Sequence, residues 1–207
     1  MYWRISIVSL ILLGAVPPAN AVEIATYGTG LMSCSTYVNA REGESADEVT
    51  FIDWLVGYLS GVNATSNRRN NVLGISGIRE TMYKLDHFCR TRPLVQFGEA
   101  VGMLVMGASA APGAHSVEVT NYGSGFKSCE TYIEAREPQS LDNAEFLDWL
   151  GGYLSGVNAI SLRTNNILGG SELTQAIYWL DNYCNAHPKE PFAMAVGALV
   201  TADHRNR

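Results

Sequence analysis

The sequence predicts an all-α protein: two tandem copies of a small four-helix domain, each stapled by a disulfide bond. Three observations predict this class. The chain from Val22 onward repeats itself without a gap at an offset of 95 residues, so that Cys34 falls on Cys129. Apolar residues in each copy recur with helical rather than strand spacing, and the four cysteines occupy corresponding positions in the two copies.

The internal repeat is the strongest of these observations. About half of the positions in residues 22–105 are identical to their counterparts in residues 117–200. The longest shared stretch begins at Asp53 with Asp-Trp-Leu-Val-Gly-Tyr-Leu-Ser-Gly-Val-Asn-Ala and returns at Asp148 with one change. A fixed offset over such a length indicates tandem domains. We therefore expect repeat 1 over residues 22–105, a linker of small residues over 106–116, and repeat 2 over 117–202.

Four helices are expected in each copy. The first covers about residues 31–41, and the second begins near a capping box formed by Ser45 and Glu48. The second helix carries one apolar stripe, which consists of Phe51, Trp54, Leu55, Tyr58, Leu59 and Val62. The third covers about residues 77–90, with Ser76 as its N-cap and Ser171 as the N-cap in the second copy. Pro93 and Pro188 are expected to open the fourth helix, where proline is tolerated best.

The cysteines predict one disulfide bond within each copy. Four cysteines allow three pairings, and the repeat selects Cys34–Cys89 and Cys129–Cys184. A domain of this size has a marginal hydrophobic core, so a covalent staple is expected to contribute to its stability.

The N-terminal residues predict export. Residues 1–21 contain Arg4, an apolar run over 5–16 and the small-residue pattern Ala19-Asn20-Ala21, which are the three zones of a cleavable signal peptide. The run is shorter than the roughly 20 residues that a membrane span needs. We expect a periplasmic or secreted protein with no membrane attachment after cleavage. A net charge of −6 argues against nucleic-acid binding, which depends on clustered basic residues.

No catalytic, cofactor-binding or metal-binding constellation is predicted. No histidine in one copy matches a histidine in the other, and no nucleophile or zinc motif is present. The repeated carboxylates Asp53/Asp148 and Asp86/Asp181 could in principle cleave a glycosidic bond. Asp53 also suits the first half of a helix, where the dipole favours a negative charge, and Asp86 suits either an exposed position or an ion pair with Arg41.

The candidate contact residues lie on the second helix of each copy. Gly57 and Gly61 are four residues apart and form a surface without side chains. Tight packing inside the domain is the preferred interpretation, and a contact between the copies is the alternative. The polar residues beside the stripe are expected to cap helix ends or form buried hydrogen bonds, with a ligand or partner contact as the alternative. The candidate packing or partner contacts are Gly57, Tyr58, Ser60, Asn63, Gly152, Tyr153, Ser155 and Asn158.

Several motifs resemble known periplasmic proteins. These are a cysteine near the domain start, Trp-Leu-x-Gly-Tyr-Leu-Ser-Gly from Trp54 and Trp149, and Leu-Asp-x-x-Cys followed four residues later by proline. They resemble the HdeA/HdeB-type acid-stress chaperones and the Tai-type immunity proteins, which neutralise amidase toxins delivered by type VI secretion. The resemblance implies a small, helical, exported and disulfide-bonded fold. It carries over no functional residue except the cysteines.

The function predicted from the sequence is a non-enzymatic, exported protein-binding module, with an immunity-type toxin inhibitor as its specific form. The expected partner is then another protein, the toxin. The alternative is an acid-stress holdase whose partner is an unfolded client, and a third hypothesis is an enzyme that uses Asp53 and Asp148. None of these requires a cofactor. Two linked copies would form a pseudo-dimer within one chain, at an effective concentration in the mM range.

Overall fold

The computed structural model describes residues 24–43, 47–66, 71–73, 77–107, 121–137, 140, 142–162 and 164–205. These residues form eight α-helices and two short 3-10 helices, with two isolated bridges and no strand among them. The elements are η1 (Gly28–Leu31), α1 (Cys34–Glu42), α2 (Asp47–Thr65), α3 (Gly77–Thr91), α4 (Phe97–Gly107), η2 (Gly123–Phe126), α5 (Cys129–Ala135), α6 (Asp142–Ile160), α7 (Leu173–Ala186) and α8 (Phe192–Arg205). The all-α prediction is confirmed, whereas the predicted signal peptide and most of the predicted linker lie outside the described residues.

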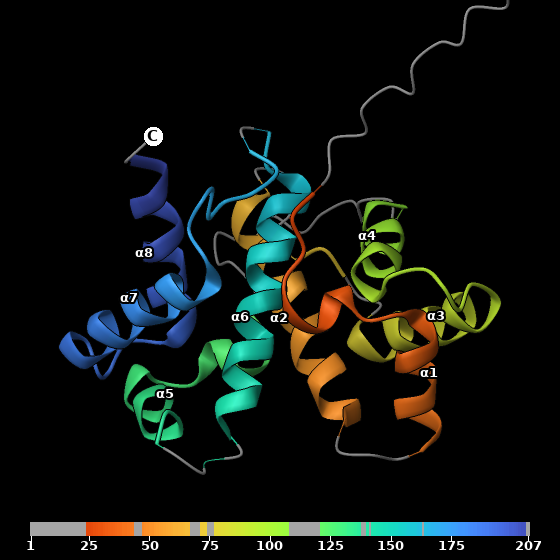
Figure 1. Cartoon of the computed structure of the whole chain (residues 1–207), viewed down its shortest axis with the longest axis horizontal. Helices are drawn as coiled ribbons and strands as arrows, with labels where there is room; N and C mark the ends of the chain where they lie inside the picture. The colour runs from red at the N-terminus through yellow and green to blue at the C-terminus, as the bar shows by residue number, and fades with distance from the viewer. Residues whose placement is uncertain are drawn as a thin grey trace, which may run out of the picture.

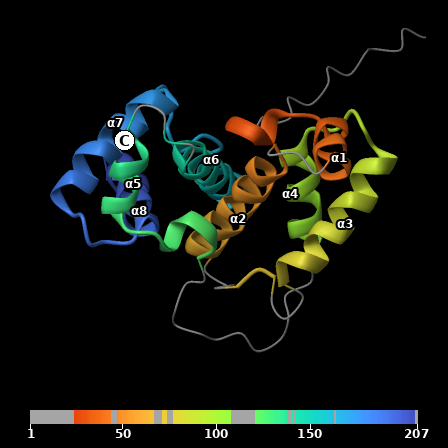
Figure 2. The same cartoon turned by 90° about the horizontal axis from the view of Figure 1, so that it is seen from below.

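Helices α2 and α6 lie side by side at the centre of the molecule (Figure 1). Helices α1, α3 and α4 gather beside α2, and α5, α7 and α8 gather beside α6, as Figure 2 shows from below. We call the described residues 24–107 the first half and 121–205 the second half. No helix in the described part of the chain is long and apolar enough to cross a membrane.

Helix α2 is buried on more than the one face that its apolar stripe predicts. Every residue from Asp53 to Asn63 is buried. The stripe faces the other helices of the first half, and α6 covers much of the remainder. A helix covered on opposite sides must tolerate burial all round, which explains the glycines and small polar residues between its apolar positions.

An aromatic cluster lies at the core of each half. In the first half, the ring centroids of Tyr37, Phe51 and Phe97 are 4.8 to 5.4 Å apart. In the second half, Tyr132, Phe146 and Phe192 are 4.6 to 5.4 Å apart. These spacings are those of favourable aromatic pairs. The two cores are not separate bodies, because Ile160 of α6 packs on the first core and Val56 of α2 belongs to the second.

Both predicted disulfide bonds are confirmed. Cys34 at the start of α1 bonds to Cys89 in α3, and Cys129 at the start of α5 bonds to Cys184 in α7. Each closes a sequence separation of 55 residues with a Cα–Cα distance of 4.8 Å. Two such bonds indicate an oxidising environment.

The start of α4 and the N-cap of α7 differ from those that the sequence predicts. Helix α4 begins at Phe97 rather than at Pro93, because the Pro93 carbonyl lies in a turn and accepts a hydrogen bond from Ser35 N at 2.9 Å. The N-cap of α7 is Glu172, whereas Ser171 donates its own N–H to the Leu168 carbonyl. The predicted caps Ser45 and Ser76 lie outside the described residues.

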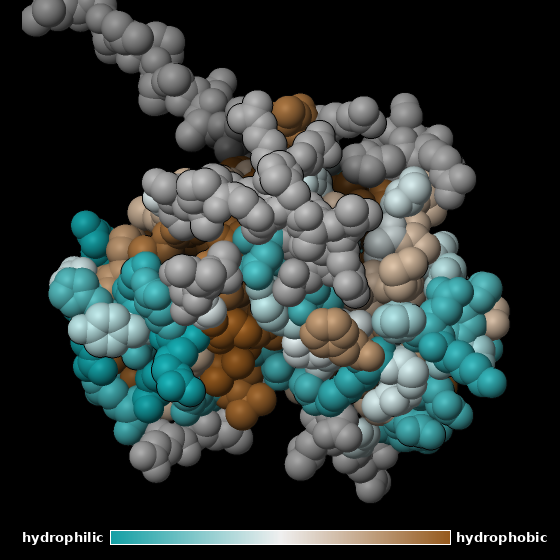
Figure 3. All heavy atoms as spheres, turned by 180° about the vertical axis from the view of Figure 1, so that it is seen from behind, coloured by the Kyte–Doolittle hydropathy of each residue, from teal (hydrophilic) through white to brown (hydrophobic). Residues whose placement is uncertain are grey.

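One face of the molecule shows where apolar side chains reach the surface. Seen from behind, hydrophilic side chains rim the two outer groups of helices, and a hydrophobic area lies between them (Figure 3). The exposed residues of this chain therefore include large apolar side chains as well as charged ones, among them Leu31, Val49 and Phe126.

Candidate functional site: the contact between α2 and α6

The repeated glycines lie where α2 and α6 cross. A Cβ atom placed on Gly57 would lie 2.1 Å from the Trp149 carbonyl oxygen, and one on Gly152 would lie 2.0 Å from the Trp54 carbonyl oxygen. Gly61 and Gly156 meet Tyr153 and Tyr58 in the same way. Any side chain at these positions would push two helix backbones apart.

The preferred interpretation of these glycines, packing within one domain, is therefore wrong. They belong to the contact between the two halves, which was the alternative. The spacing of the glycines indicates that a helix approaches them closely, but it does not identify that helix, because any helix of the chain satisfies the pattern equally.

Two serines join the halves through hydrogen bonds. Ser155 Oγ accepts from the Tyr27 N–H at 2.9 Å, and Ser60 Oγ accepts from the Tyr122 N–H at 3.0 Å. Each serine also donates to a carbonyl four residues earlier in its own helix. We call the described residues before η1 (24–27) and before η2 (121–122) the lead segments. The serine of each half thus holds the lead segment of the other half beside the central helix pair.

The lead segments themselves were not among the candidate residues. The Trp54 indole donates to the Tyr27 carbonyl and the Trp149 indole to the Tyr122 carbonyl, each at 2.7 Å. Each lead segment thus lies between a tryptophan of its own half and a serine of the other. The recurrence of Tyr-Gly at Tyr27 and Tyr122 was the only sequence signal for this arrangement.

The two asparagines form buried hydrogen bonds, as the preferred interpretation expected. Asn63 Oδ1 accepts from the Val72 N–H at 2.7 Å, and Asn158 Oδ1 accepts from the Ile167 N–H at 2.6 Å. Asn158 Nδ2 also donates to the Ala25 carbonyl at 2.8 Å. These contacts tie the loop after each central helix to that helix.

The two candidate tyrosines are core residues. Tyr58 stacks on Trp54 with centroids 5.4 Å apart, and Tyr153 lies 5.1 Å from Trp149. Burial raises the pKa of both hydroxyls, so they stay protonated at physiological pH. None of the eight candidate residues therefore remains on the surface as a free contact group.

Three carboxylates meet beside the crossing. Asp53 of α2 is 8% exposed, and its Oδ2 atom has no hydrogen-bond partner among the described residues. Burial, with the nearby negative charges of Glu145 and Asp148 as smaller causes and Lys127 opposing them, raises the pKa of the Asp53 carboxyl to about 7. Asp53 lies in the first half of α2, as expected, but its burial disfavours the negative charge on which the helix-dipole interpretation depends.

The carboxylates of Asp53 and Asp148 differ in their partners although their positions correspond. Asp148 accepts a hydrogen bond from Thr29 Oγ1 at 2.5 Å, which opposes the rise in its pKa caused by burial. Ser124, the counterpart of Thr29, donates instead to Glu145 Oε1 at 2.7 Å. Burial alone would raise the pKa of Glu145, but the hydrogen bonds from Lys127 and Ser124 lower it. Asp53 therefore lacks the hydroxyl donor that its counterpart has.

The other repeated carboxylates are structural ion-pair partners. Asp86 accepts from Tyr37 Oη at 2.7 Å and from two nitrogens of Arg41 at 3.3 Å. The second half repeats this network with Asp181, Tyr132 and Arg136, at distances of 2.7 to 3.4 Å. The expected pairing of Asp86 with Arg41 is confirmed, and such bidentate contacts hold α1 against α3.

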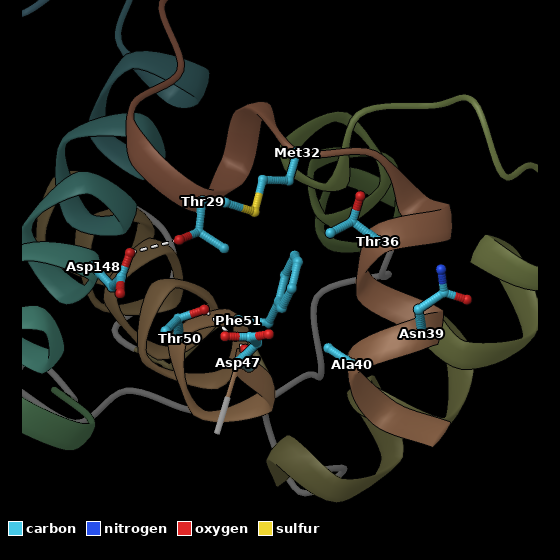
Figure 4. A pocket seen from close by; sticks show the side chains of 9 residues that line it. All are labelled: Thr29, Met32, Thr36, Asn39, Ala40, Asp47, Thr50, Phe51 and Asp148. Atoms are coloured by element: carbon cyan, nitrogen blue, oxygen red, sulfur yellow. Dashed lines mark hydrogen bonds between the residues drawn. The ribbon is translucent and has the colours of Figure 1, made fainter. Parts of the chain in front are cut away.

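An open pocket of about 510 Å³ lies between η1, α1, α2 and Asp148 of α6 (Figure 4). In Figure 4 the Phe51 ring points into its middle, while Asp148 reaches it from α6 and accepts the bond from Thr29. The remaining lining residues are Met32, Thr36, Asn39, Ala40, Asp47 and Thr50. No motif in the sequence marked this pocket, because its walls come from four separate segments.

Among the described residues, no group of three or more His, Cys, Asp or Glu side chains has a geometry that could hold a metal ion. Of the three carboxylates at the crossing, Asp148 accepts a hydrogen bond from Thr29, and Glu145 accepts from Ser124 and Lys127. Comparison with protein-family models, with curated proteins and with solved structures finds no match to this chain.

Proposed function

We propose that this chain is an exported, non-enzymatic protein-binding module whose two halves act as one pseudo-dimeric body. The observation that carries the proposal is that the repeated polar residues of the chain form hydrogen bonds within the chain. Ser60, Asn63, Asp86 and their counterparts all bond to the chain itself. Groups consumed by internal contacts are not free to attack a substrate, so the outer surface is left for recognition.

The proposal includes a tandem arrangement of two four-helix units. Its support is the offset of 95 residues together with contacts that recur at that offset, including Tyr37–Asp86 and Tyr132–Asp181. The two units meet through like surfaces, since the glycines of each contact carbonyls of the other. A self-complementary contact of this kind is that of a two-fold dimer, here within one chain.

The proposal also includes export to the periplasm. Its support is the three-zone N-terminal segment over residues 1–21 and the two disulfide bonds, which require an oxidising compartment.

Between the two expected partners, a toxin is favoured over an unfolded client. An acid-activated holdase must open when the pH falls, usually because its carboxylates lose their charge. At the crossing of α2 and α6, mild acid just below pH 7 has the opposite effect: protonation of Asp53 removes a buried charge that faces Glu145 and Asp148. Mild acid therefore tightens the contact that a holdase would have to release.

The test combines two assays on the same protein. The exported chain is co-expressed with amidase toxins directed to the periplasm, and cell survival and complex formation by size exclusion are measured. The purified, oxidised chain is then mixed with an aggregating client at pH 3 and at pH 7. We expect rescue by a stoichiometric complex and no suppression of aggregation at either pH.

A matched control is the chain without residues 1–21, which should give no rescue because it stays in the cytoplasm. Suppression of aggregation only at pH 3, together with no rescue from any amidase, would establish the holdase and reject the inhibitor.

A further inference from the structure

The two halves differ at a pair of corresponding positions beside the pocket of Figure 4. The second half has Lys127 and Glu145 where the first half has Met32 and Thr50. The backbones at Met32 and Lys127 agree, with φ/ψ of −69°/156° and −66°/152°. Each carbonyl also accepts a hydrogen bond from the phenylalanine that starts α4 or α8, at 2.7 and 2.8 Å. The two side chains therefore leave the backbone at equivalent places.

In the second half, Lys127 shows which group fits this place. Its Nζ atom lies 2.7 Å from Glu145 Oε2 and 5.5 Å from the centroid of the Phe146 ring. An ammonium group next to both a carboxylate and an aromatic face gains from a charge-assisted hydrogen bond and from the ring quadrupole.

In the first half, the corresponding place is the open pocket. Its aromatic wall is Phe51, the counterpart of Phe146, and its carboxylates are Asp47 and Asp148. No basic residue occurs among the described residues that line it. Burial raises the pKa of the Asp148 carboxyl, and the hydrogen bond from Thr29 orients the group and partly offsets that rise. The pocket thus has no counterpart of either Lys127 or Glu145, but two carboxylates from other positions, Asp47 and Asp148, line it together with the buried Phe51 ring.

We propose that this pocket binds a primary alkylammonium group, held beside Asp148 and Asp47 as Lys127 is held beside Glu145. Two sources share this chemistry: a lysine side chain of a partner protein and a free diamine. The lysine of a partner rests on the proposed function, whereas the ammonium site itself does not and is tested without a partner.

The experiment is a titration of the folded, oxidised chain, followed through the backbone amide signals of Thr29 and Thr36. The probes are Nα-acetyl-lysine methylamide, its norleucine analogue of nearly equal length without the ammonium group, and 1,5-diaminopentane. We expect saturable shifts with a roughly millimolar dissociation constant for the lysine probe. The norleucine probe should bind at least about tenfold more weakly, and Asp148→Asn should weaken the lysine probe by about fivefold or more.

The most discriminating variant introduces a lysine at position 32, beside the pocket. Met32 is 46% exposed, so the chain should fold with either substitution used here. Met32→Lys places an internal ammonium in the pocket and should abolish binding of the lysine probe. Met32→Leu, the matched control, should retain it.

The results of these titrations decide whether the ammonium site exists and which source of the ammonium group it favours. Equal binding of the lysine and norleucine probes, or undiminished binding to Met32→Lys, overturns the ammonium site. Tighter binding of the lysine probe than of the diamine assigns the site to a polypeptide, and the reverse order assigns it to a free amine. Failure to find any toxin partner would remove the proposed function and leave the titration unaffected.

Discussion

The buried carboxyl of Asp53 makes the stability of this protein depend on pH in a direction that can be worked out. The folded state holds this group with a pKa of about 7, against an ordinary value of 3.8. Between these two values the folded state binds a proton that the unfolded chain has lost. The free energy of unfolding therefore falls as the pH rises from about 4 to about 7, and this loss is complete above the folded pKa.

The size of the effect follows from the shift. One pKa unit corresponds to about 1.4 kcal/mol, so the full shift is worth about 4 kcal/mol, and about 2.5 kcal/mol of it is lost between pH 5 and pH 8. Asp53→Asn keeps the shape of the side chain and removes the ionisation. Relative to the wild type, the variant should gain about 2.5 kcal/mol of stability between pH 5 and pH 8.

The assay is urea unfolding of both proteins, disulfides intact, at pH 5, 6, 7 and 8, with the difference in unfolding free energy plotted against pH. Asp148→Asn is the matched control, since Asp148 has the same place in the other half but accepts a bond from Thr29. That variant keeps an amide oxygen that can accept the bond, and it should show a weaker pH dependence. A difference between Asp53→Asn and wild type that stays constant from pH 5 to pH 8 would refute the reasoning.

Three further predictions concern the contacts that hold the fold. Gly57→Ala should destabilise the protein by about 3 kcal/mol or more in thermal or urea unfolding, because its Cβ atom would lie 2.1 Å from a backbone oxygen. The control Gly107→Ala should have little effect, because no atom lies within 4 Å of the Cβ position there. Tyr37→Phe removes a hydrogen bond to an aspartate that remains paired with arginine, and should cost about 1 kcal/mol in urea unfolding. Replacing Cys34 and Cys89 together by alanine should cost about 4 kcal/mol, read as a lower unfolding midpoint under oxidising conditions, and a midpoint unchanged from the wild type would contradict the assigned role of that bond.

Local features of the fold were predictable because their causes are local. Helical spacing of apolar residues predicted α2 and α6, and the offset of the repeat paired Cys34 with Cys89. The pairing of Asp86 with Arg41 was one of the two roles expected for that aspartate. Such features depend on neighbours along one helix or on a pattern that the sequence repeats.

The candidate site was predictable only in part. The sequence singled out Gly57, Ser60 and Asn63 as repeated residues of the second helix, but it preferred the wrong partner for the glycines. It missed the lead residue Tyr27 and the partner Lys127, because a short extended segment and a single lysine carry no periodic signal. Their roles arise only from where the folded chain brings them.

By itself, the sequence determined the helices, the two disulfide pairs and the correspondence between the halves, since each follows from spacing along the chain. Only the tertiary structure decided that α2 packs on α6, that Asp53 is buried without a hydrogen-bond donor to its second oxygen, and that the first half has an open acidic pocket. The physical reason is that two halves with about half of their positions identical offer many surfaces twice. Close packing in three dimensions decides which helix meets the glycine surface of α2. The spacing of the glycines along the chain does not specify that helix.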